Sequence, residues 1–403
     1  MPVADALGRI TGALHPLPPE SVGLAQAHGR VLAEDVAARL TQPPAAVSAM
    51  DGYAVRAADV ARVPATLAVI GEVPAGASFD RAVGPGEAVR IFTGAPVPAG
   101  ADAIVIQEDT VREGDAVTVN EGAPAGRFIR PAGLDFSVGD VRLQKGRLLT
   151  ARDIGLAAAM NVPWLMVTRK PRIALLATGD EIVRPGEPVG PNQIVSSNAL
   201  ALAALIAARG GEAVDLGIAR DNRASLTAMA EGARGADMLI TLGGASVGDH
   251  DLVQRVLGEQ GLDVDFWRIA MRPGKPLMFG TIGDTPMLGL PGNPVSSLVC
   301  GLVFVSAALH TMLGRSGDYL ETDTARLGRD LPANDERQDY LRATLTRDDS
   351  GALVATPFGK QDSSMLSRLA AAQALVIRPP GAPAATQGTQ VPIVRIEAPD
   401  QGL

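Results

Sequence analysis

The sequence predicts an α/β protein of several domains, with a central parallel sheet covered by helices. Its 403 residues exceed the length of one ordinary domain. From Arg172 to about residue 316, short apolar runs alternate with segments of helical length, which is the pattern of a parallel sheet. Before and after this segment, short strand-like runs alternate with Gly/Pro turns, which is typical of β-rich units.

We expect four parts along the chain. A helical and linker subdomain takes residues 1–44 and 140–171, and a β-rich lid subdomain takes residues 45–139. The α/β domain takes residues 172–316, and a C-terminal β subdomain takes residues 317–403.

The N-terminal part is predicted to be helical, because apolar residues recur at helical spacing as far as Val36. Pro43 and Pro44 then stop the pattern, since proline cannot continue a helix. A second helix is expected over residues 150–162. The strands of the β-rich part are expected at Thr66–Ile70, Ala88–Phe92, Ala103–Gln107 and Ala116–Val119.

The α/β part is predicted to alternate strictly. We expect strands at Ile173–Ala177, Ala213–Ile218, Met238–Leu242 and Met287–Leu290, and helices at Asn198–Arg209, Ala224–Ala233, Asp249–Gln260 and Val295–Met312. Asn198 is expected to be the N-cap of its helix, and Gly210 is expected to end that helix. The last strand of the chain is expected at Val391–Ile396.

Composition limits the class of protein. The net charge of -8 argues against a nucleic-acid binder, which would carry a basic surface. Cys300 is the single cysteine, so no internal disulfide can form, and its apolar surroundings predict a buried, inert thiol. The N-terminus lacks the features of a signal peptide. The apolar run from Val295 to Leu309 falls short of the roughly 20 residues that cross a bilayer, so we expect a core helix and a cytoplasmic protein without a membrane partner.

Acidic residues follow two of the predicted strands. Ligands of an open parallel sheet bind beyond the carboxyl ends of its strands. Asp180 and Glu181 follow the first strand, and Asp221 follows the second. These carboxylates can bind Mg²⁺ or a substrate hydroxyl, and they can equally cap a turn or a helix. The residues alone leave both interpretations open.

Two loops at the same edge suit an anion. The segment from Gly243 to Gly248 brings backbone N–H groups close together, as a phosphate or oxyanion requires, although a plain tight turn has the same composition. Its spacing is neither that of the P-loop nor that of the dinucleotide fingerprint. Further along, Arg268, Arg272 and Lys275 lie in a loop stiffened by prolines, which favours an anion site.

Other kinds of site are not indicated. Four histidines and one cysteine cannot form a zinc-ribbon site, and no Gly-x-Ser-x-Gly elbow occurs. The segments Ser48–Ala54 and Ile91–Pro96 read as ordinary turns from their residues alone. The bottom-up prediction is therefore a site for a phosphorylated, anionic ligand, lined by acids and bases.

Six short motifs together carry a family resemblance. In chain order they are SAMDGYA at Ser48–Ala54, TGAPVPAG at Thr93–Gly100, TGDE at Thr178–Glu181, GGASVG at Gly243–Gly248, RPGKP at Arg272–Pro276 and LPGNP at Leu290–Pro294. Each motif is weak alone, but the ordered set resembles the molybdopterin molybdenumtransferase (MoeA) family, which is related to the C-terminal domain of gephyrin. The resemblance covers essentially the whole chain.

The resemblance implies an activity. The enzyme would place molybdenum from molybdate on adenylylated molybdopterin and release AMP, with Mg²⁺ as cofactor. It also implies an elongated homodimer of four subdomains per chain, a molybdopterin-binding domain that resembles the molybdopterin adenylyltransferase, and that adenylyltransferase as a possible partner. The active cleft would lie between this domain and the β-rich subdomain of the partner chain.

The resemblance also assigns site residues. The catalytic group would be Asp51, Thr93, Glu181, Asp221, Asp251 and Lys275, with Asp221 and Asp251 as metal ligands. The substrate-binding group would be Asp135, Gly243, Gly244, Ser246, Gly248, Arg268, Arg272, Pro291, Pro294, Arg342 and Ser363.

The chain departs from the family pattern at a few positions. Val47 stands where the family often has asparagine, Arg268 and Arg272 stand for lysine, Ala245 stands for valine, and Ser196 stands for an acid. Three alternatives remain: a non-catalytic scaffold, a relative that handles tungstate, and an unrelated phosphotransferase. The last would need a nucleotide motif, and the chain has none.

Overall fold

The computed structural model describes residues 1–74, 76–243, 252–259 and 261–396. By the density of contacts the chain divides into two units, which we describe separately. Unit 1 comprises residues 1–34, 145–151 and 166–403, and unit 2 comprises residues 35–144 and 152–165.

Unit 1 contains the predicted α/β domain, built on a six-stranded sheet in the order β16-β13-β17-β21-β20-β18. The first four strands are parallel: β16 (Glu212–Ala219), β13 (Arg172–Thr178), β17 (Met238–Leu242) and β21 (Thr285–Leu290). The last two, β20 (Met278–Ile282) and β18 (Leu262–Trp267), are antiparallel additions that the sequence analysis did not predict. The α/β prediction is confirmed, but the sheet is mixed.

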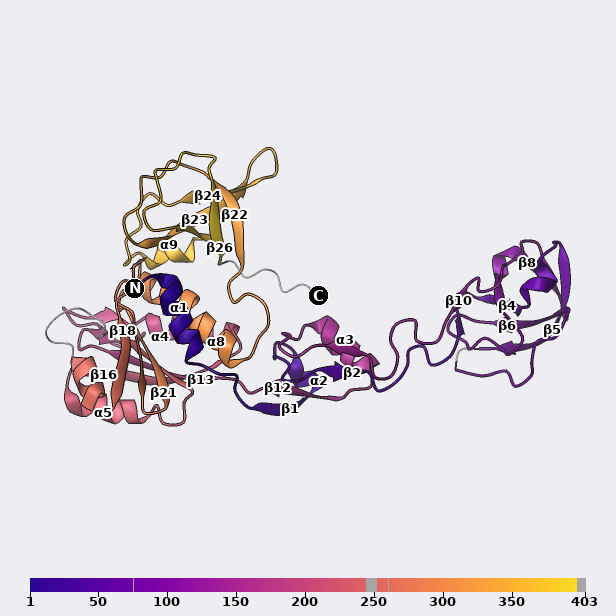
Figure 1. Cartoon of the computed structure of the whole chain (residues 1–403), viewed down its shortest axis with the longest axis horizontal. Helices are drawn as coiled ribbons and strands as arrows, with labels where there is room; N and C mark the ends of the chain where they lie inside the picture. Colours follow the sequence, from indigo (N-terminus) through magenta and orange to yellow (C-terminus); the bar gives the residue numbers. More distant parts are fainter. Residues whose placement is uncertain (75, 244–251, 260, 397–403) are drawn as a thin grey trace. The chain divides into compact units, whose positions relative to one another are not determined.

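Alternation along β13 shows how the helices cover this sheet. Ile173, Leu175 and Ala177 enter one buried cluster, and Ala174 and Leu176 enter another, because neighbouring strand residues face opposite sides. The first face is covered by α1 (Val3–Gly12), α4 (Asn198–Ala208), α7 (Pro294–Cys300) and α8 (Ser306–Met312). The second is covered by α5 (Arg223–Glu231) and α6 (Leu252–Glu259), as Figure 1 shows for α4 and α5.

The helix predicted at Val295–Met312 forms, with a π-helical turn at Gly301–Val305 in its middle. Gly301 lies there against Leu202 of α4, where a Cβ atom would have no room. By length and composition alone this helix could cross a membrane, but 78% of its apolar window is buried inside the protein. The prediction of a core helix is confirmed.

Cys300 lies at the end of α7 and is fully buried, as predicted. Burial raises the pKa of its thiol, since the thiolate would lose its hydration. We therefore expect no reaction of the native protein with a maleimide, and one alkylated thiol per chain after unfolding in guanidinium, measured by intact mass. Alkylation of the native protein at the unfolded rate would contradict this burial.

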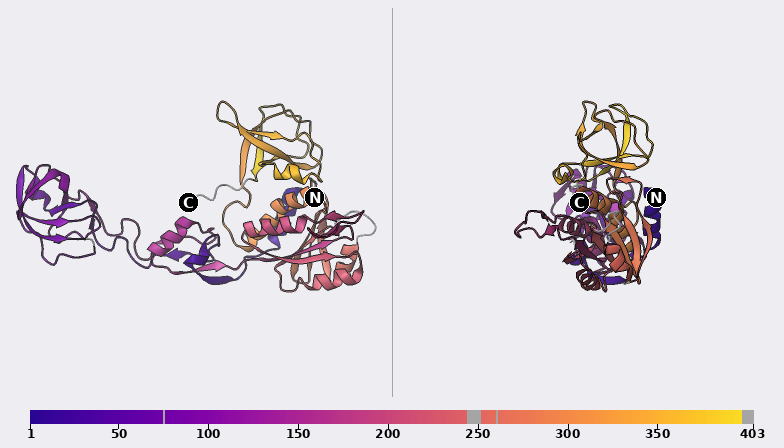
Figure 2. Two further views of the ribbon diagram at one scale, coloured as in Figure 1. Left: turned by 180° about the vertical axis from the view of Figure 1, so that it is seen from behind. Right: turned by 90° about the vertical axis from the view of Figure 1, so that its left-hand side faces the viewer.

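The C-terminal sheet of unit 1 has the strand order β23-β24-β22-β26-β25. It is a closed barrel, because the last strand, β25, pairs back with β23. Its strands are β22 (Thr322–Leu327), β23 (Gln338–Arg347), β24 (Leu353–Pro357), β25 (Ala374–Arg378) and β26 (Gln390–Arg395), drawn in orange to yellow in Figure 2. The helix α9 (Leu366–Ala370) lies between β24 and β25 in the chain. A short strand from the α/β domain, β19 (Met271–Arg272), pairs with β23.

Unit 2 contains the β-rich part predicted at residues 45–139, together with residues that were expected in the helical and linker subdomain. Its six-stranded sheet has the order β7-β4-β6-β5-β9-β8, and the four predicted strands are confirmed. The strands are β4 (Gly52–Val55), β5 (Ala65–Val73), β6 (Glu87–Ile91), β7 (Ala103–Ile106), β8 (Thr110–Glu113) and β9 (Ala116–Val119). Further elements of this region are two short strand pairs, β2 (Val36–Ala37) with β11 (Val141–Leu143) and β3 (Val47–Ser48) with β10 (Ile129–Arg130), and the predicted helix α3 (Ala151–Ala159).

Two local predictions are wrong. Helix does not continue to Val36: α1 ends at Gly12, and the chain then forms β1 (Pro19–Gly23) and the four-residue α2 (Leu24–Ala27). Pro16, Pro18 and Pro19 interrupt the apolar spacing, which alone had suggested a helix. Asn198 is also not an N-cap, because that position is taken by Ser197.

Candidate functional site

The acids predicted at the sheet edge come together at the carboxyl ends of β13 and β16. Glu181 is exposed, and its carboxylate lies so close to Gly179 that a Cβ atom at that position would displace the carboxylate. Gly179 also has a φ of 137°, which side-chain-bearing residues rarely adopt. The backbone N–H of Asp221 lies 3.4 Å from Oδ1 of Asp180. Glycine at residue 179 therefore lets two acidic turns meet at one edge.

A cavity of about 550 Å³ opens at this edge of the sheet. Four predicted site residues line it: Glu181, Gly243, Pro291 and Pro294. Further polar residues that were not predicted as site residues also line it: Thr178, Ser196, Ser197, Asn198, Asn293 and Ser364. Each of these residues lies within a motif or near the start of a helix, and that position is the signal that could have found it. Strand ends and helix starts thus converge on one polar cavity.

The three cations of the basic loop do not share one environment. Lys275 is exposed, and no ion pair within the described part of the chain involves it. Arg268 has a φ of 77°, and its guanidinium lies 5.2 Å from the ring centroid of Trp267. Gly274 has a φ of 115° and lies against the thiol of Cys300, so a side chain at this position would lift the loop off α7. Lys275 follows directly, next to the cavity-lining Pro276.

Arg272 is already paired. Its guanidinium forms an ion pair with Asp335 at 3.1 Å, a second with Asp339, and a hydrogen bond with Asn334 at 3.1 Å. The pairing of β19 with β23 places Arg272 opposite Asp339. Two carboxylates neutralise this arginine, so it is less suited than Lys275 to hold an anion. Arg272 lines a separate space of about 270 Å³ in the barrel.

The pairing of Asp335 has a consequence for stability. Hydrogen bonds from Arg337, together with the charge of Arg272, lower the pKa of Asp335 from 3.8 to about 2. A carboxylate whose pKa is depressed stabilises the fold above its unfolded pKa, and that stabilisation disappears as the pH falls through the folded pKa. We expect D335N to be less stable than wild type at pH 7 and the difference to shrink between pH 4 and pH 2, measured by urea unfolding. A difference that is constant with pH would contradict this.

Arg342 and Ser363, both predicted to bind substrate, are not among the residues that line the cavity. The side chain of Arg342 is buried, and it donates from Nε to the Oε1 of Gln361 at 3.1 Å and from Nη1 to the carbonyl of Met365 at 3.3 Å. The carbonyl of Ser363 accepts a hydrogen bond from the N–H of Val295 at 3.1 Å. All three contacts hold the chain locally, and the predicted roles of these residues in substrate binding stay predictions.

In unit 2, Asp51 and Thr93 form one group. Oδ1 of Asp51 accepts the backbone N–H of Thr93 at 2.7 Å and its hydroxyl at 2.8 Å. These hydrogen bonds lower the pKa of Asp51, so it is ionised at neutral pH. Asp135 lines a hollow of about 690 Å³ that Arg130 and Gly94, the residue after Thr93, also line, but Asp51 and Thr93 are not among its lining residues.

Four predicted residues, Gly244, Ser246, Gly248 and Asp251, lie outside the described residues. Within the described ranges no group of three His, Cys, Asp or Glu side chains could hold a metal. Asp221 therefore offers one carboxylate at the sheet edge. A single carboxylate is enough for Mg²⁺ only if substrate phosphates and water molecules supply the other ligands of the ion.

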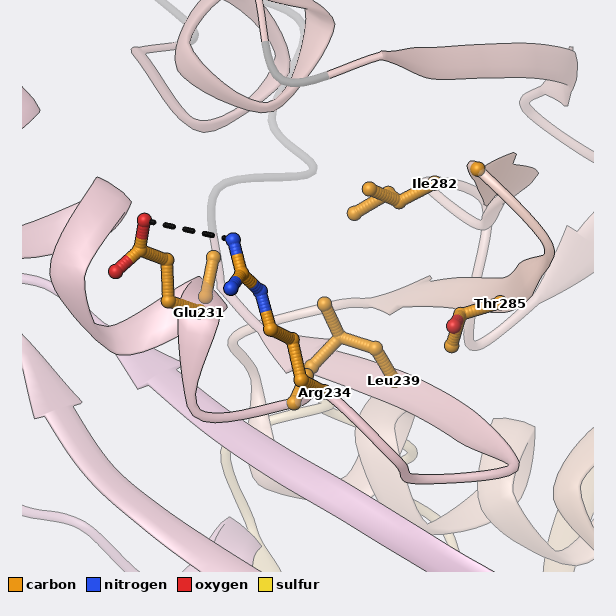
Figure 3. Close-up of a pocket in the computed structure, with 8 residues that line it drawn as sticks. Glu231, Arg234, Leu239, Ile282 and Thr285 are labelled. Carbon is orange, nitrogen blue, oxygen red and sulfur yellow. Dashed lines mark ion pairs between the residues drawn. The ribbon is translucent and has the colours of Figure 1, made fainter.

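A further pocket lies at the amino ends of the parallel strands, away from all predicted site residues. Figure 3 shows its lining, with Glu231 and Arg234 paired at 3.9 Å beside Leu239, Ile282 and Thr285. Its position at the wrong end of the sheet does not suit a ligand site of an open α/β fold.

Three segments that together make up most of the chain match known families. Residues 1–161 match the MoeA N-terminal region (domains I and II), residues 174–311 match a probable molybdopterin-binding domain, and residues 324–396 match the MoeA C-terminal region (domain IV). Two solved structures of a molybdopterin biosynthesis MoeA protein from Pyrococcus horikoshii superpose with TM-scores of 0.85 and 0.86, at 33% and 29% identity. They cover 99% and 98% of this chain, and 99% of each solved chain is covered.

Named relatives agree over nearly full length. The molybdopterin molybdenumtransferase of a Nostoc species is 36% identical, over 94% of this chain and 88% of the relative. Molybdopterin molybdenumtransferase 2 of Mycobacterium tuberculosis is 37% identical, over 93% of this chain and 94% of the relative. The Bacillus subtilis enzyme of the same name is 34% identical, over 98% and 94%. The chain belongs to the molybdopterin molybdenumtransferase (MoeA) family.

Proposed function

We propose that the protein inserts molybdenum from molybdate into adenylylated molybdopterin and releases AMP, as a step of molybdenum-cofactor biosynthesis. One observation supports this most directly. The polar cavity at the carboxyl edge of the sheet lies within the segment that matches the probable molybdopterin-binding domain, apart from Ser364. Its size suits a ligand of the pterin class, since small-molecule sites measure about 300–1,000 Å³.

The proposed reaction brings two negatively charged substrates together in one site. Molybdate is a dianion, and the diphosphate of the adenylylated substrate adds further negative charge, so cations must offset the repulsion. Lys275 has no ion-pair partner among the described residues and lies in the chain beside a lining residue of the cavity. We propose that Lys275 binds the oxyanion and that Arg268 is a second cation at this site. Glu181 is placed to accept hydrogen bonds from pterin amines or hydroxyls.

Mg²⁺ is proposed as the cofactor, with Asp221 and Asp251 as its carboxylate ligands. Bound there, it would neutralise charge on the phosphoanhydride. Asp51 and Thr93 are proposed to act on the same reaction from unit 2, through the ionised carboxylate of Asp51. We further propose a cytoplasmic homodimer that receives its substrate from a molybdopterin adenylyltransferase.

The test is AMP release from adenylylated molybdopterin with Mg²⁺, in the presence and absence of molybdate. Molybdate-dependent release, with formation of active cofactor, would support the proposal. Release that depends on tungstate instead would assign a different oxyanion. A folded protein that releases no AMP with either oxyanion would refute the proposed reaction and favour the scaffold alternative.

A further inference from the structure

The turn from Leu290 to Pro294, which lines the cavity, is held from three directions. The N–H of Gly243 donates to the carbonyl of Leu290 at 3.2 Å. The N–H of Val295 donates to the carbonyl of Ser363 at 3.1 Å. The carboxamide of Asn198 donates to the carbonyl of Gly292 at 2.7 Å. Of these three contacts, only that of Asn198 comes from a side chain, and a substitution can remove it.

Asn198 is the first residue of α4, yet its side chain does not cap that helix. The N-cap position belongs to Ser197, which makes no side-chain cap hydrogen bond. The carboxamide instead reaches across 94 positions of sequence to the turn after β21. A carbonyl oxygen only accepts, so the nitrogen of the carboxamide must face Gly292, and the direction of this hydrogen bond is fixed.

The backbone of Gly292 packs closely against the end of a second strand, which in turn packs against the end of a third. A Cβ atom on Gly292 would lie 3.7 Å from the Cα of Gly243. A Cβ atom on Gly243 would in turn lie 3.1 Å from the carbonyl oxygen of Thr178. The ends of β13, β17 and β21 therefore pack almost backbone to backbone, so a shift of Gly292 reaches both neighbouring strand ends, where the cavity lies.

We propose that Asn198 is a positioning residue for the pterin-binding cavity: its hydrogen bond to Gly292 fixes the turn that forms one wall. The proposal rests on the proposed function for the identity of the ligand. Asn198 is uncharged, and it acts on the cavity through its hydrogen bond to the carbonyl of Gly292.

The experiment compares N198A and N198D with wild type. Aspartate keeps the shape of asparagine but is ionised at neutral pH and cannot donate to the carbonyl. Both variants should therefore bind adenylylated molybdopterin about tenfold more weakly, the scale of one lost hydrogen bond to a constrained group. Affinity is measured by pterin fluorescence without molybdate or Mg²⁺. Hydrogen exchange of the peptide that covers residues 289–297 should become faster in both variants.

Q373A is the matched control. In the wild type, the carboxamide of Gln373 also contacts a backbone group, because its oxygen accepts the N–H of Leu345 at 2.9 Å. Gln373 lies in the barrel, however, and does not line the cavity. Q373A should leave both the affinity and the exchange of residues 289–297 unchanged.

The outcomes separate this proposal from the proposed reaction. Wild-type affinity in N198A, with or without faster exchange at the turn, would overturn the positioning role and leave the reaction untouched. An N198D variant that binds like wild type would also overturn it, because side-chain shape alone would then suffice. A wild-type protein that binds the pterin but releases no AMP would refute the reaction and leave the role of Asn198 standing.

Discussion

The D51A variant is expected to fold like wild type and to release AMP about 10²–10⁴-fold more slowly, the range of a lost acid–base or charged group. Asp51 is ionised at neutral pH, because hydrogen bonds from Thr93 lower its pKa. It lies in the turn between β3 and β4 and is partly exposed, so its loss leaves no cavity in the core. The measurement is single-turnover AMP release, with circular dichroism to confirm the fold.

D51N separates charge from geometry in this experiment. The amide oxygen of asparagine can still accept the N–H and the hydroxyl of Thr93, so the turn at Thr93 keeps its anchor. If the negative charge of Asp51 is what the reaction needs, D51N should be as slow as D51A. If Asp51 only holds the turn, D51N should release AMP at nearly the wild-type rate. Wild-type release in D51A itself would remove Asp51 from the chemistry.

The K275A variant is expected to need roughly 10–100-fold more molybdate for half-maximal AMP release, which corresponds to about 1.5–3 kcal/mol for a charged hydrogen bond. Lys275 is exposed and unpaired among the described residues, so its charge is free to meet an anion. Fold stability should change little, because the side chain is not part of the core. The measurement is a titration of AMP release with molybdate.

Two variants sharpen the result for Lys275. K275R keeps the charge and should shift the titration less than K275A does. K170A removes another exposed lysine, which lies two residues before the start of β13 at the opposite edge of the sheet, and should leave the titration unchanged. A K275A titration that overlays wild type would refute the assignment of the oxyanion to Lys275.

Most of the fold was predictable because regular patterns determine it. The apolar run Ile173–Ala177 in β13 and the helix-length segments after it predict a covered parallel sheet, and the structure confirms these elements. The antiparallel strands β18 and β20 were not predicted, because the turn between them holds the basic loop and masks the strand pattern. The helix expected as far as Val36 does not form, because Pro16, Pro18 and Pro19 interrupt the apolar spacing soon after α1 ends.

The site was predictable only as a set of motifs. Glu181, Gly243, Pro291 and Pro294 do meet at one cavity, as expected from strand ends that share an edge. Two details depend on tertiary contacts that no local pattern carries. The carboxylates that neutralise Arg272 lie more than 60 positions away in sequence. The partner of Asn198 lies 94 positions away, so a local pattern could suggest only an N-cap.

The strand β19 limits how far this protein can be treated as a set of interchangeable modules. The loop that carries Lys275 leaves the α/β sheet, contributes Met271 and Arg272 to the edge of the barrel, and returns to the sheet as β20. A fragment cut before the barrel would leave this loop with an unpaired strand and Arg272 without its two carboxylates. A truncation that separates the α/β domain from the barrel would thus disturb the loop to which we assign the oxyanion, because this loop depends on the barrel for its strand partner and for the carboxylates that pair with Arg272.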